Sequence, residues 1–443
     1  MSSAVLHESP SKFRLDPRAR RALNASMVGT LIEWYDYALY GAAAGLVISQ
    51  LFFPQAISSA GTLAAFATFA VGFVVRPIGG VIVAHIGDKY GRKPAMILTI
   101  VLMGAATVGI GLLPTALDIG FWAPALLVVF RCLQGFGAGA ELAGAFTLVA
   151  EYTPQEKRGF YTGLLNATPA AGTTLATIAF LIVSTLPTDV LLGWAWRLPF
   201  LLSGILFFVA LYIRRRLEET PAYTEAAEKR GRTAEKHKIP LAELFQKSGR
   251  NLIAGTLATT GLNANLYVLT AFSIAFLTGS VGLSRTDALT AVIVSSVFGM
   301  VGAPIGGLLT DKFGARKVLI FGGAFGAVFA FPMFMAMQSG NLPIVIAGMS
   351  IGQAVTMGAC LGSQGKFLTN LFPTRYRFTG VATAREVNGA VIAGTTPLVA
   401  TALVAAVGGA IWLAALYIAF CSLVTVFAVF IARGAGDVEA TDD

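Results

Sequence analysis

The chain has 443 residues, of which 56% are hydrophobic and only 12% charged, and its formal net charge is +9. Soluble domains carry about 25% charged residues, so this composition, with a mean hydropathy of +0.73, excludes an ordinary soluble protein. The excess of cations indicates membrane topology rather than nucleic-acid binding, because the cations are concentrated in loops between apolar stretches.

Apolar stretches follow one another along the whole chain, and each is long enough to cross a bilayer, which takes about 20 residues per helix. Several carry small residues four apart, such as Gly41 with Gly45 and Gly135 with Gly139, which let helix backbones approach closely in lipid. The sequence therefore predicts an all-α membrane protein with twelve transmembrane helices. The twelve stretches lie near residues 24–49, 59–84, 94–113, 122–148, 160–184, 195–213, 250–278, 287–310, 317–337, 343–371, 379–405 and 409–432.

Lys and Arg residues are unevenly distributed over the loops that join these stretches. Most lie in the N-terminal segment, in the loops near 87–93 and 311–317, and in a polar interruption at 214–249, whereas the opposite loops hold Arg285 as their only cation. The positive-inside rule then places both termini in the cytoplasm. We expect a multi-pass, monomeric protein of the plasma (inner) membrane, with the lipid bilayer as its surroundings.

The polar interruption from Arg214 to Gly249 divides the chain into two sets of six stretches. It mixes acidic and basic residues, a composition typical of a solvated linker. The predicted organisation is an N-terminal cytoplasmic segment, a first six-helix bundle, a linker, a second six-helix bundle and a short tail. These parts correspond to residues 1–22, 23–213, 214–249, 250–433 and 434–443.

A short cation-rich phrase occurs once in each half, between two apolar stretches. It reads Asp-Lys-Tyr-Gly-Arg-Lys at residues 88–93 and Asp-Lys-Phe-Gly-Ala-Arg-Lys at residues 311–317. This repeat predicts two pseudo-symmetric bundles that rock around a central site. Charges at these helix ends can bridge neighbouring helices and hold the cytoplasmic face closed; the alternative is that they only set topology. The predicted cytoplasmic gate consists of Asp88, Lys89, Gly91, Arg92, Asp311, Lys312, Gly314 and Arg316.

Ionisable residues also lie well inside the predicted spans, where each costs about 2.5–3.5 kcal/mol on insertion scales unless it is paired or faces a wet cavity. Depth along the helices places Asp36 and Arg131 together near the midplane. Glu33, Arg76 and Glu141 form a second group nearer the cytoplasm. We predict that these five residues carry proton coupling. The alternative is that they form static buried ion pairs.

The first predicted span has a distinct polar face. Glu33, Asp36, Tyr37 and Tyr40 lie at positions i, i+3, i+4 and i+7, which places them on one side of a helix. A stripe of acids and phenols on a membrane helix is typical of a face that relays protons along a cavity. A carboxyl there can bind and release a proton as its surroundings alternate between a neighbouring Arg and an apolar environment.

Cations inside the second half indicate the chemistry of a substrate. Arg385 and Lys366 suit a carboxylate, whereas pairing of either residue with Glu386 is the structural alternative. Matching the two halves on their repeated motifs sets Gln134 of the first half against Gln353 of the second. The candidate substrate-binding residues are Arg385, Lys366, Glu386, Tyr37, Tyr40, Gln134, Asn166, Asn263, Tyr267 and Asn388.

Catalytic and metal-binding motifs are missing from the sequence. Cys132, Cys360 and Cys421 lie within spans and lack metal-ligand spacing. We therefore expect no enzyme activity, no metal and no cofactor, with protons as the coupling ion and a small, anionic molecule as the ligand.

The duplicated loop and Arg131-Cys-Leu-Gln134-Gly135 together resemble the major facilitator superfamily. Finer motifs are similar to its metabolite:proton symporter branch, namely Glu33-Trp34-Tyr35-Asp36-Tyr37-x-x-Tyr40-Gly41, Arg76-Pro77 and Glu219-Thr220-Pro221-x-Tyr223. The resemblance implies two six-helix bundles, alternating access and proton-coupled uptake. It also implies a substrate among carboxylates such as citrate, 2-oxoglutarate and shikimate, or among zwitterionic osmolytes.

Three residues depart from the pattern of that branch near the expected substrate path. Lys366 replaces a small residue, and Arg385 and Glu386 stand where an aromatic and an amide residue are more usual. The preferred interpretation is proton-coupled import of a small organic acid by alternating access. The alternatives are a betaine or proline importer, a proton-driven exporter of drugs or metabolites, and a nutrient sensor built on a transporter scaffold.

Overall fold

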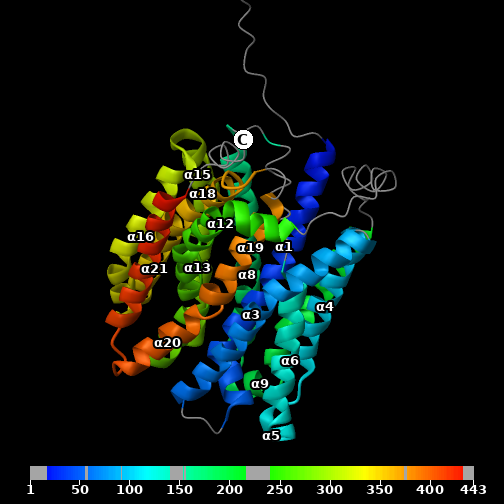
Figure 1. The fold of residues 1–443 in the computed structure, drawn as a ribbon. Helices are drawn as coiled ribbons and strands as arrows, with labels where there is room; N and C mark the ends of the chain where they lie inside the picture. The colour runs from blue at the N-terminus through cyan, green and yellow to red at the C-terminus, as the bar shows by residue number, and fades with distance from the viewer. Residues whose placement is uncertain are drawn as a thin grey trace, which may run out of the picture.

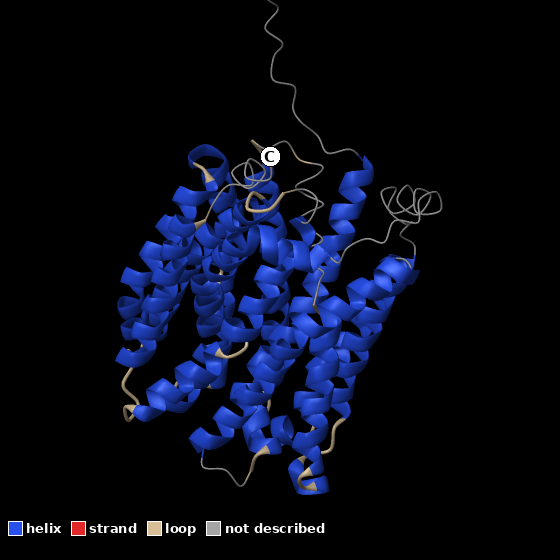
Figure 2. Ribbon diagram, viewed as in Figure 1, coloured by secondary structure: helices blue, strands red, loops and turns tan. Residues whose placement is uncertain are grey.

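The computed structural model describes residues 17–54, 58–90, 92–139, 153, 156–215, 240–373 and 377–432. Regular structure within these residues is entirely helical, and most of the helices run roughly side by side (Figures 1 and 2). Helices suit a lipid environment because each satisfies its own backbone hydrogen bonds. By length and composition, eight of the described helical runs can cross a membrane, and three shorter apolar helices accompany them.

The N-terminal half begins with α1 (Pro17–Ala43), which continues through a π-helical turn, η1 (Ala44–Ile48), into α2 (Ser49–Phe52). The first helix thus starts at Pro17, before the expected bundle boundary at residue 23; proline favours the first position of a helix. The half continues with α3 (Ser58–Tyr90), α4 (Arg92–Leu112), α5 (Ala116–Ile119), α6 (Trp122–Gly137), α8 (Arg158–Ser184), α9 (Thr188–Gly193), η2 (Ala195–Arg197) and α10 (Leu198–Arg215).

The C-terminal half begins with α12 (Pro240–Ala258), which bends at Ser248, where φ is −127° and ψ is 22°. The bend lies beside the expected boundary between the linker and the second bundle. The half continues with α13 (Thr260–Tyr267), η3 (Val268–Phe272), α14 (Ser273–Phe276), η4 (Leu277–Val281), α15 (Arg285–Phe313), α16 (Ala315–Gln338), α17 (Leu342–Ile351), η5 (Gly352–Met357), α18 (Gly358–Thr369), α19 (Arg377–Asn388), η7 (Gly389–Ala393), α20 (Thr396–Ala406) and α21 (Trp412–Ile431).

The two halves meet along α8 and α15, which run in opposite directions. At one end Gly159 lies against Gly307, and at the other the Arg285 guanidinium donates to the Thr188 hydroxyl over 3.2 Å. A Cβ atom added to Gly163 would lie 2.6 Å from the carbonyl oxygen of Ala303. Small residues therefore bring the two backbones together, as they do between helices in lipid.

A second contact between the halves joins the first span to the seventh. A Cβ atom on Gly41 would lie 3.3 Å from that of Ala271, and one on Gly45 would lie 2.9 Å from that of Ala275. This confirms that the Gly41/Gly45 pair serves close helix packing. The pair Gly135/Gly139 does the same for α6 against α3, since a Cβ on Gly135 would lie 1.9 Å from the Gly72 carbonyl oxygen.

Large apolar side chains cover much of the outer surface. Val328 is 78% exposed, Phe430 is 69% exposed and Phe208 is 67% exposed. Exposed apolar surface of this extent marks a surface that is covered by something other than water. In a chain with this many apolar helices, lipid provides that cover.

Close packing of α8 on α15 leads to a stability prediction. Gly163→Ala should lower the free energy of unfolding by about 1–3 kcal/mol, because the added methyl group meets a backbone carbonyl that has no room to move. Gly193→Ala is the matched control, since nothing lies within 4 Å of the added atom. Thermal unfolding of both purified variants in detergent measures the difference, and equal stabilities would contradict the packing described.

Candidate functional site

A cavity lies between the two halves and is lined by side chains from both. The N-terminal half contributes Trp34 from α1 and Asn166 and Thr173 from α8. A cavity between two bundles is a common location for a small-molecule site. The polar side chains that the C-terminal half contributes are Asn263, Thr270, Ser296, Gln353, Gln364 and Arg385.

Arg385, on α19, is the charged side chain of this cavity wall; the other lining side chains among the described residues are neutral. A guanidinium presents several N–H donors in a fixed plane, which matches the two oxygens of a carboxylate. The structure therefore places the predicted carboxylate-binding residue where a ligand shared by the two halves would reach it.

Two of the predicted asparagines also lie in the cavity wall, and each makes a contact that positions it. Asn166 donates to the Leu361 carbonyl over 2.7 Å, which joins α8 to α18 across the two halves. Asn263 donates to Asn388 Oδ1 over 2.6 Å. Asn388 itself donates to Thr260 Oγ1 over 2.9 Å, so it supports Asn263 from outside the wall.

A buried ionic bridge also joins the two halves, through a guanidinium of α3. Arg76 Nε donates to Glu386 Oε2 of α19 over 2.9 Å. Arg76 Nη2 donates to Glu33 Oε1 of α1 over 3.2 Å. Glu386 is thus paired with Arg76, whereas the structural alternative paired it with Lys366 or Arg385; its predicted role in substrate binding stays a prediction. Glu141, expected in this group, lies outside the described residues.

Arg131, on α6, is fully buried and is held by neutral groups. Its guanidinium donates to the Phe69 carbonyl over 2.9 Å and to Gln134 Oε1, and it stacks over the Tyr40 ring at 4.2 Å. The close approach at Gly72, where a Cβ would lie 2.7 Å from Arg131 Nη2, lets the guanidinium lie against the α3 backbone. These groups satisfy the guanidinium without a carboxylate.

The expected ion pair between Asp36 and Arg131 is therefore not formed. Asp36 is 2% exposed and faces the hydroxyl groups of Thr107 and Ser203. Gln134 Nε2 donates to Thr107 Oγ1 over 2.8 Å, so a chain of polar groups connects the two residues indirectly. One oxygen of Asp36, Oδ1, has no hydrogen-bond partner among the described residues.

The three tyrosines that were predicted to bind substrate lie outside the cavity wall, in an aromatic cluster. Tyr37 packs between two guanidinium groups, 5.0 Å from Arg76 and 5.4 Å from Arg131. Tyr40 bonds through its hydroxyl group to Thr68 Oγ1. Tyr267 belongs to the other half, and its ring packs on this cluster.

Contacts of the Tyr267 ring join the halves near the cavity. Its centroid lies 5.3 Å from that of Phe73 and 5.7 Å from that of Phe69, both on α3. It also stacks on Trp34 of α1, at 6.4 Å. Since Trp34 lines the cavity, the cluster supports one side of the wall. Gln134, also predicted to bind substrate, is used within the N-terminal half by Arg131 and Thr107.

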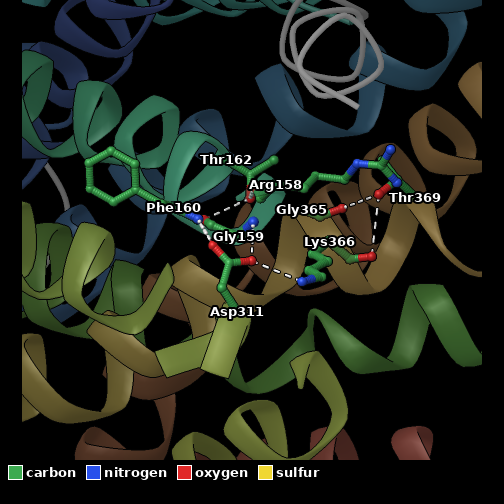
Figure 3. A network of polar contacts seen from close by, with 8 residues as sticks. All are labelled: Arg158, Gly159, Phe160, Thr162, Asp311, Gly365, Lys366 and Thr369. Atoms are coloured by element: carbon green, nitrogen blue, oxygen red, sulfur yellow. Dashed lines mark hydrogen bonds and ion pairs between the residues drawn. The ribbon is translucent and has the colours of Figure 1, made fainter. Parts of the chain in front are cut away.

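Asp311 crosses between the halves at the end of the bundle that is predicted to be cytoplasmic (Figure 3). Its Oδ1 accepts from the Gly159 backbone N–H over 2.8 Å, and its Oδ2 accepts from that of Phe160 over 2.9 Å. These are free N–H groups of the first turn of α8, where a carboxylate is favoured by the helix dipole. The last turn of α15 is thereby attached to the first turn of α8.

Lys366 belongs to this network and not to the cavity. Its Nζ donates to Asp311 Oδ1 over 2.9 Å (Figure 3). The prediction that Lys366 assists in carboxylate binding is therefore wrong. The lysine lies on the turn of α18 beyond the cavity, and the nearest acceptor there is the gate carboxylate.

The remaining residues of the second repeated loop stay within the C-terminal half. Lys312 Nζ lies 5.2 Å from the centre of the Phe313 ring, and Arg316 donates to the Ala432 carbonyl over 2.7 Å. Gly314 has φ of +90°, a conformation that favours glycine and that allows α15 to turn into α16. Of the first repeated loop, Gly91 and the side chains of Asp88, Lys89 and Arg92 lie outside the described residues.

Comparison with known proteins decides the family. The family model described as "Sugar (and other) transporter" matches residues 22–242. The shikimate transporter of Escherichia coli K12 is 37% identical over 409 residues, which cover 91% of this chain and 92% of the relative. The proline/betaine transporter of the same strain is 34% identical over 395 residues, which cover 88% of this chain and 78% of the relative.

This chain belongs to the major facilitator superfamily. It lies in the branch that contains the shikimate and proline/betaine transporters, and it is a multi-pass membrane transporter rather than an enzyme. A crystal structure of D-xylose-proton symporter, 19% identical, superposes with a TM-score of 0.72 over 92% of this chain and 97% of that one. Twelve membrane helices in two pseudo-symmetric bundles are thus its fold.

Several residues that line the cavity of this transporter were not predicted from the sequence. Trp34 stands inside a family motif, and Gln353 matches Gln134 in the repeat, so both carried a signal. Ser296 and Gln364 are polar residues inside apolar stretches, as many others are. Which of them face the cavity follows from helix rotation, which the sequence pattern of a mostly apolar helix leaves undefined.

In the part of the chain that the structure describes, no three His, Cys, Asp or Glu side chains are grouped so that they could hold a metal ion.

Outside the spans, Asp118 completes a capping box at the start of α5. The hydroxyl and backbone N–H of Thr115 donate to this carboxylate and hold its pKa below the usual range.

The ionic bridge leads to a second stability prediction. Arg76→Gln should lower the free energy of unfolding by about 3–5 kcal/mol, because it leaves two buried carboxyl groups without their cation. Glu386→Gln should cost less, since Arg76 keeps Glu33. Thermal unfolding in detergent compares both with Lys317→Gln, an exposed control. If the Arg76 variant proved as stable as that control, the bridge would not hold the halves together.

Proposed function

We propose that this transporter imports a small organic acid together with protons, by alternating access. The observation that carries the proposal is the position of Arg385 and Glu386, neighbours on α19. One lines the cavity, and the other forms the ionic bridge to Arg76 in the opposite half. An anion bound by Arg385 would therefore lie beside the residue next in the chain, Glu386, whose ion pair with Arg76 joins the two halves.

Charge balance around the cavity supports coupling to protons. Arg76 and Arg385 supply two positive charges, and Glu33 and Glu386 supply two negative ones. An acid that binds as an anion adds a further negative charge to a site whose lining residues are mostly buried. A proton on one of the carboxyl groups restores neutrality, which lowers the cost of burying the charges. One proton per added negative charge is the ratio that this balance favours.

Closing contacts at both ends of the cavity support alternating access. At the predicted cytoplasmic end, the Asp311 contacts to α8 act as the gate. At the opposite end, Gly41 and Gly45 pack on the seventh span. In the proposed cycle one set of contacts separates while the other stays closed. Together with the positive-inside rule, we propose that both termini lie in the cytoplasm and that the protein acts as a monomer in the plasma (inner) membrane.

The names of the relatives support the same class of substrate and coupling. The transporter that is 37% identical is named for shikimate, a carboxylic acid. The solved structure with the same fold is titled a proton symporter. These names agree with a cation in the cavity and with the buried carboxyl groups beside it.

Import of a betaine-like or proline-like osmolyte is the second candidate, because Trp34 lines the cavity. The face of a tryptophan ring attracts a quaternary ammonium group, and a relative 34% identical is named a proline/betaine transporter. Arg385 in the same wall opposes that cation, which favours the acid.

Uptake into liposomes tests the proposal directly. The purified transporter is reconstituted, an inward proton gradient is imposed, and labelled monocarboxylic, dicarboxylic and aromatic acids are compared with glycine betaine. We expect an acid to accumulate above its external concentration, and a protonophore to abolish the accumulation. Accumulation of betaine and of no acid would overturn the proposal.

Arg385→Ala should weaken the apparent affinity for the transported acid by about tenfold to hundredfold. This is the effect expected from losing a charge-assisted hydrogen bond, since about 1.4 kcal/mol corresponds to a factor of ten. Arg250→Ala, an exposed arginine far along the chain, serves as control. Uptake measured over a range of acid concentrations gives the affinity. An unchanged value in the Arg385 variant would remove this residue from the binding site.

Glu386→Gln and Asp36→Asn should each retain exchange of the acid across the membrane but lose accumulation against its gradient. Each change removes a buried carboxyl that can carry a proton while it preserves the shape of the side chain. Counterflow into preloaded liposomes measures exchange, and gradient-driven uptake measures coupling. Asp118→Asn, which alters an exposed carboxylate outside the spans, should retain both activities. Full accumulation by either buried variant would exclude that residue from coupling.

A further inference from the structure

Two side chains of the cavity wall have polar atoms that the protein leaves without partners. Ser296, on α15, is 2% exposed, and Gln364, on α18, is 3% exposed. Ser296 Oγ and Gln364 Oε1 have no hydrogen-bond partner among the described residues, and both residues line the cavity. Buried polar atoms of native proteins are almost always hydrogen-bonded. A polar group of a ligand, or water before a ligand binds, is the partner that a cavity of this kind would supply.

The chemistry of these atoms limits what that ligand carries. An amide oxygen only accepts, and a hydroxyl group both donates and accepts. The ligand must therefore present a donor to Gln364, such as an O–H group. A quaternary ammonium group has no hydrogen to donate, and an ionised carboxylate only accepts. Neither of them satisfies Gln364.

The charge of the cavity wall limits the number of carboxylates that a ligand can carry. Arg385 is its only charged side chain among the described residues, and the polar remainder consists of amides and hydroxyls. A second carboxylate would find no second cation there, because Lys366 is held at the gate by Asp311 and Arg76 is held by two glutamates. Burying an unpaired charge is costly.

We propose that the cavity selects a monocarboxylate that bears at least one hydroxyl group, with Arg385 bound to the carboxylate and Gln364 and Ser296 bound to the hydroxyl. This assignment rests on the proposed transport of an organic acid and specifies its substrate class. Gln364 and Ser296 are then specificity-determining residues, since a site built to hydrogen-bond a hydroxyl group discriminates against the analogue that lacks it.

Paired ligands test the assignment on the purified transporter in detergent. Shikimate is compared with 1-cyclohexenecarboxylate, and lactate with propionate; each pair differs only in its hydroxyl groups. Succinate and glycine betaine complete the panel. Affinity is read from the rise in unfolding temperature with ligand concentration. We expect at least one hydroxylated acid to bind about tenfold or more tightly than its partner, and succinate and betaine to bind more weakly than that acid.

Substitutions then locate the discrimination. Gln364→Leu and Ser296→Ala should reduce the preference for the hydroxylated acid over its hydroxyl-free partner to near unity, because they remove the polar groups that the hydroxyl satisfies. Gln338→Leu and Ser339→Ala, which alter exposed residues at the end of α16, are the matched controls and should retain the preference. Retention of the full preference by both cavity variants would overturn the assignment.

The outcomes separate this inference from the proposed function. If acids bind but the hydroxyl groups confer no advantage in the unmodified protein, or if succinate binds most tightly, the substrate class is wrong while acid transport stands. If no acid binds and none accumulates in liposomes, the proposed function itself fails. The first comparison uses the unmodified chain, so it holds even where a variant does not fold.

Discussion

Ionisable side chains are tolerated inside a membrane protein when they are paired or hydrogen-bonded, and in this transporter one ionic pairing is shared between the two halves. Arg76 comes from the N-terminal half, where it keeps Glu33, and it binds Glu386 of the C-terminal half. Glu386 therefore has its charge partner in the opposite half. The halves are joined at the level of the cavity by an interaction that depends on the charge of its carboxyl groups.

The two ends of the molecule are closed by different chemistry. At the predicted cytoplasmic end, a carboxylate binds backbone N–H groups of a helix and a lysine of its own half, Lys366. In the proposed cycle, opening the gate would separate Asp311 from the α8 backbone, whereas Lys366, which belongs to the same half, can stay paired with it. At the opposite end, Gly41 and Gly45 pack on small residues of the seventh span, and the Arg285 guanidinium donates to the Thr188 hydroxyl. Among the described residues, opening that end separates no ion pair.

Sequence patterns predicted the fold well, because apolar length, loop charge and an internal repeat are properties that a bilayer imposes directly on the chain. They also predicted that Arg385 lies on the substrate path, and it lines the cavity. They failed where the rotation of a helix about its axis decides which side chains meet. Asp36 and Arg131 lie at similar depth, yet α6 approaches α3 so closely at Gly72 that carbonyl groups and Gln134 satisfy the guanidinium first.

Lys366 shows a second limit of sequence reasoning, since depth along a helix does not reveal which neighbour is within reach. Its true partner, Asp311, follows only when α15 and α18 are placed side by side. The tyrosines of the first span were predicted to bind substrate because they are polar residues in an otherwise apolar helix. They instead pack around Arg76 and Arg131, and this contact depends on how α1, α3 and α6 are placed relative to one another.

Glycines and an alanine form part of the contact between α8 and α15, with backbone lying against backbone at Gly163 and Ala303 and at Gly159 and Gly307. Interlocking side chains, as in ridge-and-groove packing, would have to be withdrawn and re-inserted whenever one bundle tilts against the other. A smooth contact has no such barrier, so the two bundles can pivot about this line at little cost. In the proposed cycle, resistance to this tilting would then come from the ionic and hydrogen-bonded contacts between the halves rather than from the packing along the pivot.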